Sequence, residues 1–312
     1  MNDLSIIVPI YNEESNLEEL YTRLEKCISG ITANYEILFV NDGSEDKSYD
    51  IIKSYANKNH KIRYINFSRN FGHQIAISAG IDNCNGKAVV IMDGDLQDPP
   101  ELIPELYTKY KEGYNVVYAK RKSRKGEGFF KKITAKFFYR ILSKITSVNI
   151  PLDTGDFRLI DDKILKHLRL MPEKHKFIRG QISWLGFKQT FVEYDRDSRK
   201  HGETKFTYKK MINFAIDGIT SFSSFPLKIV TMLGFIVSVI ALIIILYALY
   251  SKFILDRVIT GWTSLIISTM FIGGVQLLSI GIIGEYISRI NSEVKNRPLY
   301  IIDEDNLSED KE

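Results

Sequence analysis

Two long apolar runs near the C-terminus limit the folds open to this chain more than any other feature of its sequence. No Asp, Glu, Lys or Arg occurs from Ile229 to Tyr250 or from Val258 to Gly284. Each run exceeds the roughly 20 apolar residues that cross a bilayer as a helix. We expect a two-helix membrane anchor over residues 226–288. Two buried helices of a large soluble core are the alternative, but such helices rarely run this long without a charge.

The basic residues that flank these runs predict their orientation, because Lys and Arg concentrate on the cytoplasmic side of a membrane. They precede the first run and follow the second: Lys200, Lys205, Lys209, Lys210 and Lys228, then Arg289, Lys295 and Arg297. The short connecting loop holds only Lys252 and Arg257, beside Asp256. We therefore expect a multi-pass protein of the cell (inner, cytoplasmic) membrane with both termini in the cytoplasm. The N-terminus lacks the pattern of a signal peptide.

The first hundred residues alternate between strand-like and helix-like segments. Strands are predicted at 5–10, 35–40, 62–67 and 88–92, and helices at 13–28, 47–57 and 72–83. Strands that are apolar on both faces and alternate with helices indicate a parallel sheet covered on both sides. Ligands of such sheets bind at the carboxyl ends of the strands.

Polar clusters follow three of these strands. They are Pro9 to Glu13, Asn41 to Ser44, and Asp93-Gly94-Asp95. Residues two apart on a strand point the same way, so the last cluster would present two carboxylates, which suit Mg²⁺ or Mn²⁺ and a phosphate-bearing substrate. Turns and helix caps are the alternative for each cluster.

Basic and acidic segments follow the α/β pattern. Nine Lys or Arg residues face only Glu127 between Ala119 and Arg140, and apolar residues recur there at helical spacing. We interpret 119–147 as a basic amphipathic segment that binds the membrane surface, with a solvated charge run as the alternative. A second amphipathic helix is expected at the interface over 206–225. The tail 289–312 is expected in the cytoplasm, and its acidic end from Asp303 to Glu312 is expected to be disordered. Cys27 and Cys84 lack metal-ligand spacing and are expected to be reduced.

Taken together, several motifs resemble those of family 2 glycosyltransferases of the GT-A fold, in the branch that uses polyprenyl phosphate. They are the segments 5–13, 40–44, 66–72, 92–100 and 153–159, followed by the two apolar runs. The resemblance implies an α/β fold class, with a Rossmann-like, mostly parallel GT-A domain over residues 1–205. It also implies an inverting transfer of a sugar from a nucleotide donor, UDP-glucose or UDP-N-acetylglucosamine, to undecaprenyl phosphate.

The resemblance also assigns roles to individual residues. The nucleotide-sugar site would contain Pro9, Tyr11, Glu13, Asp42, Asp93, Gln97, Arg196, Arg199 and Lys205. The metal would be Mg²⁺ or Mn²⁺ on Asp93, Asp95 and Gln97, and the catalytic residues would be Asp93, Asp95 and Asp156. Arg196, Arg199 and Lys205 would neutralise the diphosphate from a closing segment.

On the acceptor side, the lipid phosphate would be bound by Arg121, Lys131 and Lys132. For Asp156, an ion pair with Arg158 or another Arg is the alternative to a role near the acceptor. We expect a membrane partner and no nucleic acid. Glycines at 273, 274, 281 and 284 permit close helix packing and hence homo-oligomers.

Two other functions stay open at this point. A processive polysaccharide synthase would carry Gln-x-x-Arg-Trp, whereas Gln181-Ile182-Ser183-Trp184 lacks that Arg. A non-catalytic nucleotide-binding membrane scaffold would not need Asp93, Asp95, Arg196 and Arg199, all of which are present.

Overall fold

The protein is described by a computed structural model over residues 2–122, 154–195, 225–254 and 261–307. The described residues form two compact units. One is an α/β unit, which also contains residues 298–307, and the other holds the two apolar helices.

Parallel strands form the centre of the α/β unit. They are β1 (Asn2–Ile10), β2 (Tyr35–Asn41), β3 (Ile62–Phe67) and β4 (Gly86–Ile91). β1 pairs in parallel with β2 and β4, and β2 pairs in parallel with β3. All seven residues of β2 are buried, as expected for a strand covered on both faces. The predicted α/β alternation and parallel pairing are confirmed.

Further strands extend the sheet on both sides. They are β5 (Val116–Arg121), β6 (Thr154–Asp161), β7 (Gln189–Tyr194) and β8 (Ile302–Asp305). The order across the sheet is β7-β5-β6-β4-β1-β2-β3-β8. β6 runs antiparallel to β4 and β5, and β8 runs antiparallel to β3. The sheet is therefore mixed outside its parallel centre.

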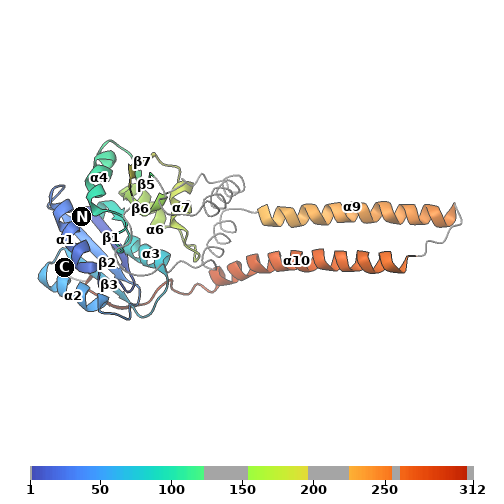
Figure 1. The fold of residues 1–312 in the computed structure, drawn as a ribbon, viewed down its shortest axis with the longest axis horizontal. Coiled ribbons are helices and arrows are strands. Elements are labelled where there is room, and N and C mark those ends of the chain that lie inside the picture. The colour runs from blue at the N-terminus through green and yellow to red at the C-terminus, as the bar shows by residue number, and fades with distance from the viewer. Residues whose placement is uncertain (1, 123–153, 196–224, 255–260, 308–312) are drawn as a thin grey trace. The chain divides into compact units, whose positions relative to one another are not determined.

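Helices cover both faces of this sheet (Figure 1). On one face lie α1 (Leu17–Ser29), α2 (Ser48–Lys58) and α4 (Ile103–Lys111), the last preceded by the short η1 (Pro100–Leu102). On the other lie α3 (His73–Asn83), α6 (Asp162–Arg169) and α7 (Ile178–Trp184). In α1 the buried residues Leu17, Leu20, Leu24 and Ile28 recur every three or four positions, so one stripe faces the sheet.

The second unit consists of α9 (Phe225–Phe253) and α10 (Trp262–Val294), which contact each other. Both contain stretches long and apolar enough to cross a membrane, judged by length and composition. Many of their large apolar side chains are exposed, among them Phe235, Ile243 and Phe271. Such a surface indicates association with a membrane. The interfacial helix predicted at 206–225 lies outside the described residues, apart from Phe225, where α9 begins.

Two predictions from the sequence need correction. Ala119 to Arg121 belong to β5, so the basic segment begins as a strand, and its residues 123–147 lie outside the described part. The first part of the acidic tail is ordered, contrary to the prediction, because Ile302–Asp305 pair with β3 as β8, whereas residues 308–312 lie outside the described part. Glu304 accepts hydrogen bonds from Lys53 and Tyr64, so donors of the α/β unit bind this acidic side chain.

A buried ion pair links β2 and β3 at their amino-terminal halves. Arg63 Nη1 lies 2.7 Å from Glu36 Oε2, and both side chains are almost fully buried. Glu36 also accepts a hydrogen bond from the Ser5 hydroxyl of β1. Removing one member of such a pair leaves a charge that water cannot reach.

We expect Arg63→Met to lower the free energy of unfolding by about 3–5 kcal/mol, because it strands the Glu36 carboxylate. The exposed pair of Lys109 and Glu112 provides the control, since Lys109→Met should cost less than about 1 kcal/mol. Thermal unfolding in detergent, followed by circular dichroism, measures both. Equal shifts for the two variants would contradict the role of burial.

Candidate active site at the carboxyl edge of the sheet

The loops that follow β1 and β2 are joined by hydrogen bonds. The Asn12 backbone N–H donates to Ser44 Oγ at 2.9 Å, and the Glu45 N–H donates to Asn12 Oδ1 at 2.8 Å. Asn12 adopts a positive φ of 54°, which Asn tolerates better than most residues. Tyr11 and Glu13 lie in this loop, whereas Pro9 is still within β1, opposite Val40 of β2.

Asp42 holds the loop between β3 and α3. Its buried carboxylate accepts hydrogen bonds from the backbone N–H of Phe71 at 2.7 Å and of Gly72 at 3.0 Å. Burial raises the pKa of Asp42, and these two N–H groups oppose that shift. Asp42 therefore holds residues 71 and 72 in place, with or without a bound ligand. Its predicted contact with a nucleotide remains a prediction.

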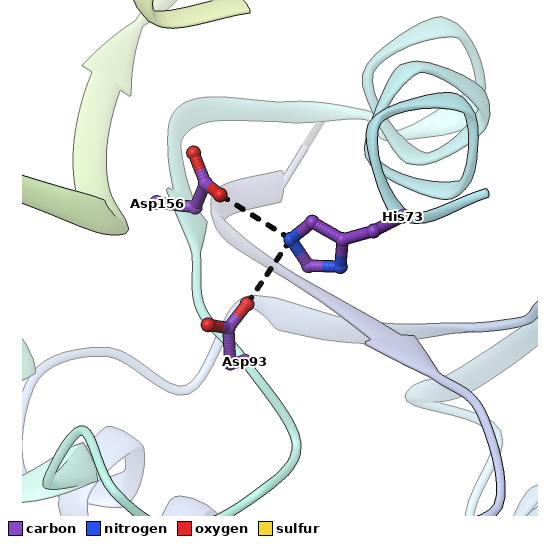
Figure 2. A group of neighbouring side chains, drawn as sticks. All are labelled: His73, Asp93 and Asp156. Atoms are coloured by element: carbon purple, nitrogen blue, oxygen red, sulfur yellow. Dashed lines mark hydrogen bonds and ion pairs between the residues drawn. The ribbon is translucent and has the colours of Figure 1, made fainter. Parts of the chain in front are cut away.

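Three side chains from different elements meet beyond the end of β4 (Figure 2). His73 Nε2, at the start of α3, lies 3.3 Å from Asp93 Oδ1 and 3.3 Å from Asp156 Oδ2. One potential ligand atom from each residue lies within 4.8 Å of the others. The register explains the meeting: Ile91 of β4 is opposite Arg158 of the antiparallel β6, so Asp93 and Asp156 lie two residues further along.

Arginines surround Asp156. Arg179 approaches it with two nitrogens, Nε at 2.9 Å and Nη2 at 3.2 Å, and Arg158 Nη2 lies 3.3 Å away. The ion pair that the sequence left open is thus present with both arginines. Burial alone would raise the pKa of Asp156, but Arg179 and His73 hold it well below its usual range. Asp156 stays ionised, and its role near an acceptor remains a prediction.

The pKa values of Asp93 and His73 are shifted by the same surroundings. Burial, opposed by His73, raises the pKa of Asp93 to about 6, and the nearby Asp156 adds to the rise. Burial lowers the pKa of His73, but Asp93 and Asp156 outweigh it and bring the value to about 9. His73 is therefore cationic at neutral pH.

Asp95 and Gln97 lie in the loop after β4 and not on the strand itself. The rule that residues two apart on a strand point the same way therefore does not apply to Asp95. The buried Asp95 accepts a hydrogen bond from the Gln97 backbone N–H at 3.2 Å. Leu96 adopts a positive φ of 58°, and a Cβ at Gly94 would lie 2.5 Å from Ile10 Cδ1. The loop is thus tightly bent against β1. Within the described residues, Asp95 is not part of the group formed by His73, Asp93 and Asp156.

Arg121 lies at the end of β5 beside the same loop. Its Nε donates to the Tyr194 hydroxyl at 3.2 Å, and its Nη2 lies 3.8 Å from Oδ1 of the fully buried Asp98. The Tyr194 hydroxyl in turn donates to Asp98. A Cβ at Gly155 would lie 2.8 Å from Arg121 Nη2, so a larger residue there would displace the end of the guanidinium. The structure therefore brings Arg121 close to the β4 loop.

Five predicted site residues lie outside the described residues: Arg196, Arg199, Lys205, Lys131 and Lys132. In contrast, His73 and Arg179 lie in the site but are not predicted from the sequence. His73 follows the third strand at the same sheet edge, so the rule that singled out the other clusters would have found it. Arg179 carries no comparable signal, because its place is defined by a long-range contact between α7 and Asp156 of β6.

Most of the α/β domain matches a known protein family. The profile of glycosyl transferase family 2 matches residues 5–169. Since this is more than half of the chain, the protein belongs to glycosyl transferase family 2, and it is a glycosyltransferase.

Individual relatives match almost the whole length. An uncharacterized glycosyltransferase of Bacillus subtilis, YkcC, is 52% identical, with 96% of this chain and 92% of the relative covered. A prophage bactoprenol glucosyl transferase homolog of Escherichia coli is 40% identical, with 96% and 98% covered. Among solved structures, S. aureus TarS 1-349 in complex with UDP-GlcNAc has a TM-score of 0.50 at 17% identity, over 70% of this chain and 66%, just under two thirds, of that chain. This last likeness shows the GT-A fold alone.

We expect Gly43→Ala to disturb the loop that Asp42 holds. Gly43 has a φ of 65°, and an added Cβ would lie 2.4 Å from the Arg69 carbonyl carbon. The clash should cost about 1–3 kcal/mol of stability beyond the backbone strain, and should lower glycosyl transfer. Gly113→Ala is the matched control, because Gly113 has a φ of 89° with nothing within 4 Å. Thermal unfolding and a transfer assay compare them, and equal losses would refute the close approach.

Proposed function

We propose that this chain is a membrane glycosyltransferase that moves one sugar from a nucleotide-diphosphate donor to polyprenyl phosphate. The extent of the similarity carries this proposal. Relatives named bactoprenol glucosyl transferase align with 96% of this chain, so the match includes the two apolar helices as well as the α/β domain. Apolar helices of this length suit an enzyme whose acceptor is a lipid.

The chemistry of the acceptor decides what the site must supply. A phosphate monoester is already anionic near pH 7, since its second pKa is about 6, so no strong general base is needed. One phosphate oxygen attacks the anomeric carbon while the bond from that carbon to the donor's phosphate oxygen breaks, and the nucleoside diphosphate leaves. This single displacement inverts the anomeric centre. Catalysis then depends on orienting the two phosphates and on balancing their charge.

The acidic residues after β4 fit a divalent cation, Mg²⁺ or Mn²⁺. Carboxylate and amide oxygens of Asp93, Asp95 and Gln97 are the hard ligands that these ions prefer. The raised pKa of Asp93, about 6, reflects its burial among carboxylates, and a cation would relieve this excess of negative charge. When bound, the ion would neutralise charge on the donor's diphosphate. Asp156 is held by Arg179 and Arg158, which argues for a positioning role over metal binding.

The donor, the nucleotide site and the membrane topology complete the proposal. UDP-glucose and UDP-N-acetylglucosamine are the proposed donors, held by the loops after β1 and β2 and by Arg196, Arg199 and Lys205. The basic residues on both sides of α9 and α10 support a multi-pass protein of the cytoplasmic membrane with the α/β unit in the cytoplasm. Small residues along α10 support homo-oligomers.

The central experiment incubates purified protein with undecaprenyl phosphate, Mn²⁺ and a panel of sugar nucleotides. We expect a lipid with one sugar from one UDP-sugar, detected by mass spectrometry, and loss of most turnover in Asp95→Ala because the metal loses a ligand. The control Asp50→Ala changes an exposed carboxylate on α2 and should keep full activity. Unchanged turnover in Asp95→Ala would refute the metal assignment.

The same experiment separates the alternatives. A processive synthase would yield a polymer, and a non-catalytic scaffold would bind the nucleotide without forming any product. Either result with intact protein would refute the proposed reaction.

Neutralising Arg121 tests the acceptor side. We expect Arg121→Gln to raise the KM for undecaprenyl phosphate by about tenfold or more, because a charged hydrogen-bond donor to phosphate is lost, while the KM for the donor changes little. Tyr194→Phe removes the hydroxyl that bridges Arg121 and Asp98 but keeps the guanidinium, so it should preserve acceptor use better. Steady-state kinetics with each substrate varied in turn gives both values, and equal losses for both substrates would contradict an acceptor role.

A further inference from the structure

The chain returns to the α/β unit after α10 through residues 298–307, which we call the C-terminal strap. Within it, β8 pairs antiparallel with β3, with Ile65 opposite Asp305 and Phe67 opposite Ile302. Without the strap, β3 would be an edge strand of this sheet with unpaired backbone groups.

Polar side chains fasten one end of the strap. Glu304 accepts hydrogen bonds from Lys53 Nζ at 2.6 Å and from the Tyr64 hydroxyl at 2.9 Å, and a further one from the Tyr49 hydroxyl. Asn306 accepts from the Tyr64 backbone N–H at 2.7 Å and donates to the Ile62 carbonyl at 3.1 Å. Together, the partners of Glu304 and Asn306 come from both α2 and β3, so the strap has a defined register on the sheet.

The other end of the strap reaches the loop that Asp42 holds. The Tyr300 ring stacks on Phe67 with ring centroids 5.1 Å apart, and Phe67 contacts the Phe71 ring edge-on at 5.6 Å. The Ser68 backbone N–H donates to the Ile301 carbonyl at 3.1 Å. Residues on both sides of Arg69 and Asn70 are thereby tied to the strap.

This loop leads directly into the site. Phe71 and Gly72 donate to Asp42, and the next residue, His73, contacts Asp93 and Asp156. A continuous series of packed and hydrogen-bonded groups thus joins Tyr300 to the acidic centre.

We propose that the strap is a positioning element of the active site, and that Tyr300 orders the 68–72 loop so that Asp42 and His73 are held ready for the donor nucleotide. The inference rests on the proposed function for its kinetic consequence, but not for the ordering of the loop. Tyr300 touches no reacting group and acts through Phe67 and Phe71.

Two readouts test the strap. Tyr300→Ala should raise the KM for the sugar nucleotide about fivefold or more with a smaller change in kcat, because the loop must be ordered when the donor binds. It should also speed trypsin cleavage after the exposed Arg69, mapped by mass spectrometry. Tyr300→Phe keeps the ring stack and should restore both values. Ile301→Ala changes an exposed side chain of the strap and serves as the matched control.

The outcomes separate the two proposals. Unchanged cleavage after Arg69 and unchanged donor KM in Tyr300→Ala would overturn the role of the strap. Faster cleavage would support it even if the unaltered protein transferred no sugar, a result that would refute the proposed function alone. Equal effects of Tyr300→Ala and Ile301→Ala would reduce the strap to a general support of the fold and overturn the inference.

Discussion

The balance of charge among carboxylates at the carboxyl edge of the sheet is the constraint on which the rest of the site depends. Asp93, Asp98 and Asp156 are brought together by the register of β4 against the antiparallel β6 and by the loop after β4. Buried carboxylates are costly unless cations match them. Arg179 pairs with Asp156 and Arg121 lies beside Asp98. The cationic His73 bridges Asp93 and Asp156. Each of these three carboxylates therefore has a basic partner from another element.

This dependence explains which parts could be predicted from the sequence. The parallel centre of the sheet and the polar loops after β1, β2 and β4 follow from local patterns, because strand, helix and turn are encoded by neighbouring residues. The contact of Asp93 with Asp156 depends instead on the pairing of β4 with β6, about 65 residues apart, and no short-range pattern reports that register. The sequence could therefore place both aspartates, and by the same rule His73, at this sheet edge, but it could not predict that His73 contacts both aspartates or that Arg179 pairs with Asp156.

For the acidic tail, the prediction from composition was wrong. An acidic composition with few large apolar residues is typical of a disordered segment, since such a segment buries too little apolar surface to offset its ordering entropy. β8 overcomes this by pairing its backbone with an open strand edge and by placing Glu304 among Tyr49, Lys53 and Tyr64. Those hydrogen bonds lower the pKa of Glu304 to about 2. The carboxylate stays ionised at neutral pH, and the contribution of its pairing to stability is lost only as the pH falls from about 4.5 toward 2.

The order of the chain adds a consequence for folding. The α/β unit is discontinuous, since β8 follows both apolar helices in the sequence. During synthesis from the N-terminus, β3 therefore stays an open edge until residues 225–297 have been made. If Tyr300 orders the 68–72 loop, this loop and the Asp42 carboxylate that binds it reach their final arrangement only after α9 and α10 exist. Completion of the site is then coupled to completion of the apolar unit, although that unit contributes none of the acidic residues described at the sheet edge.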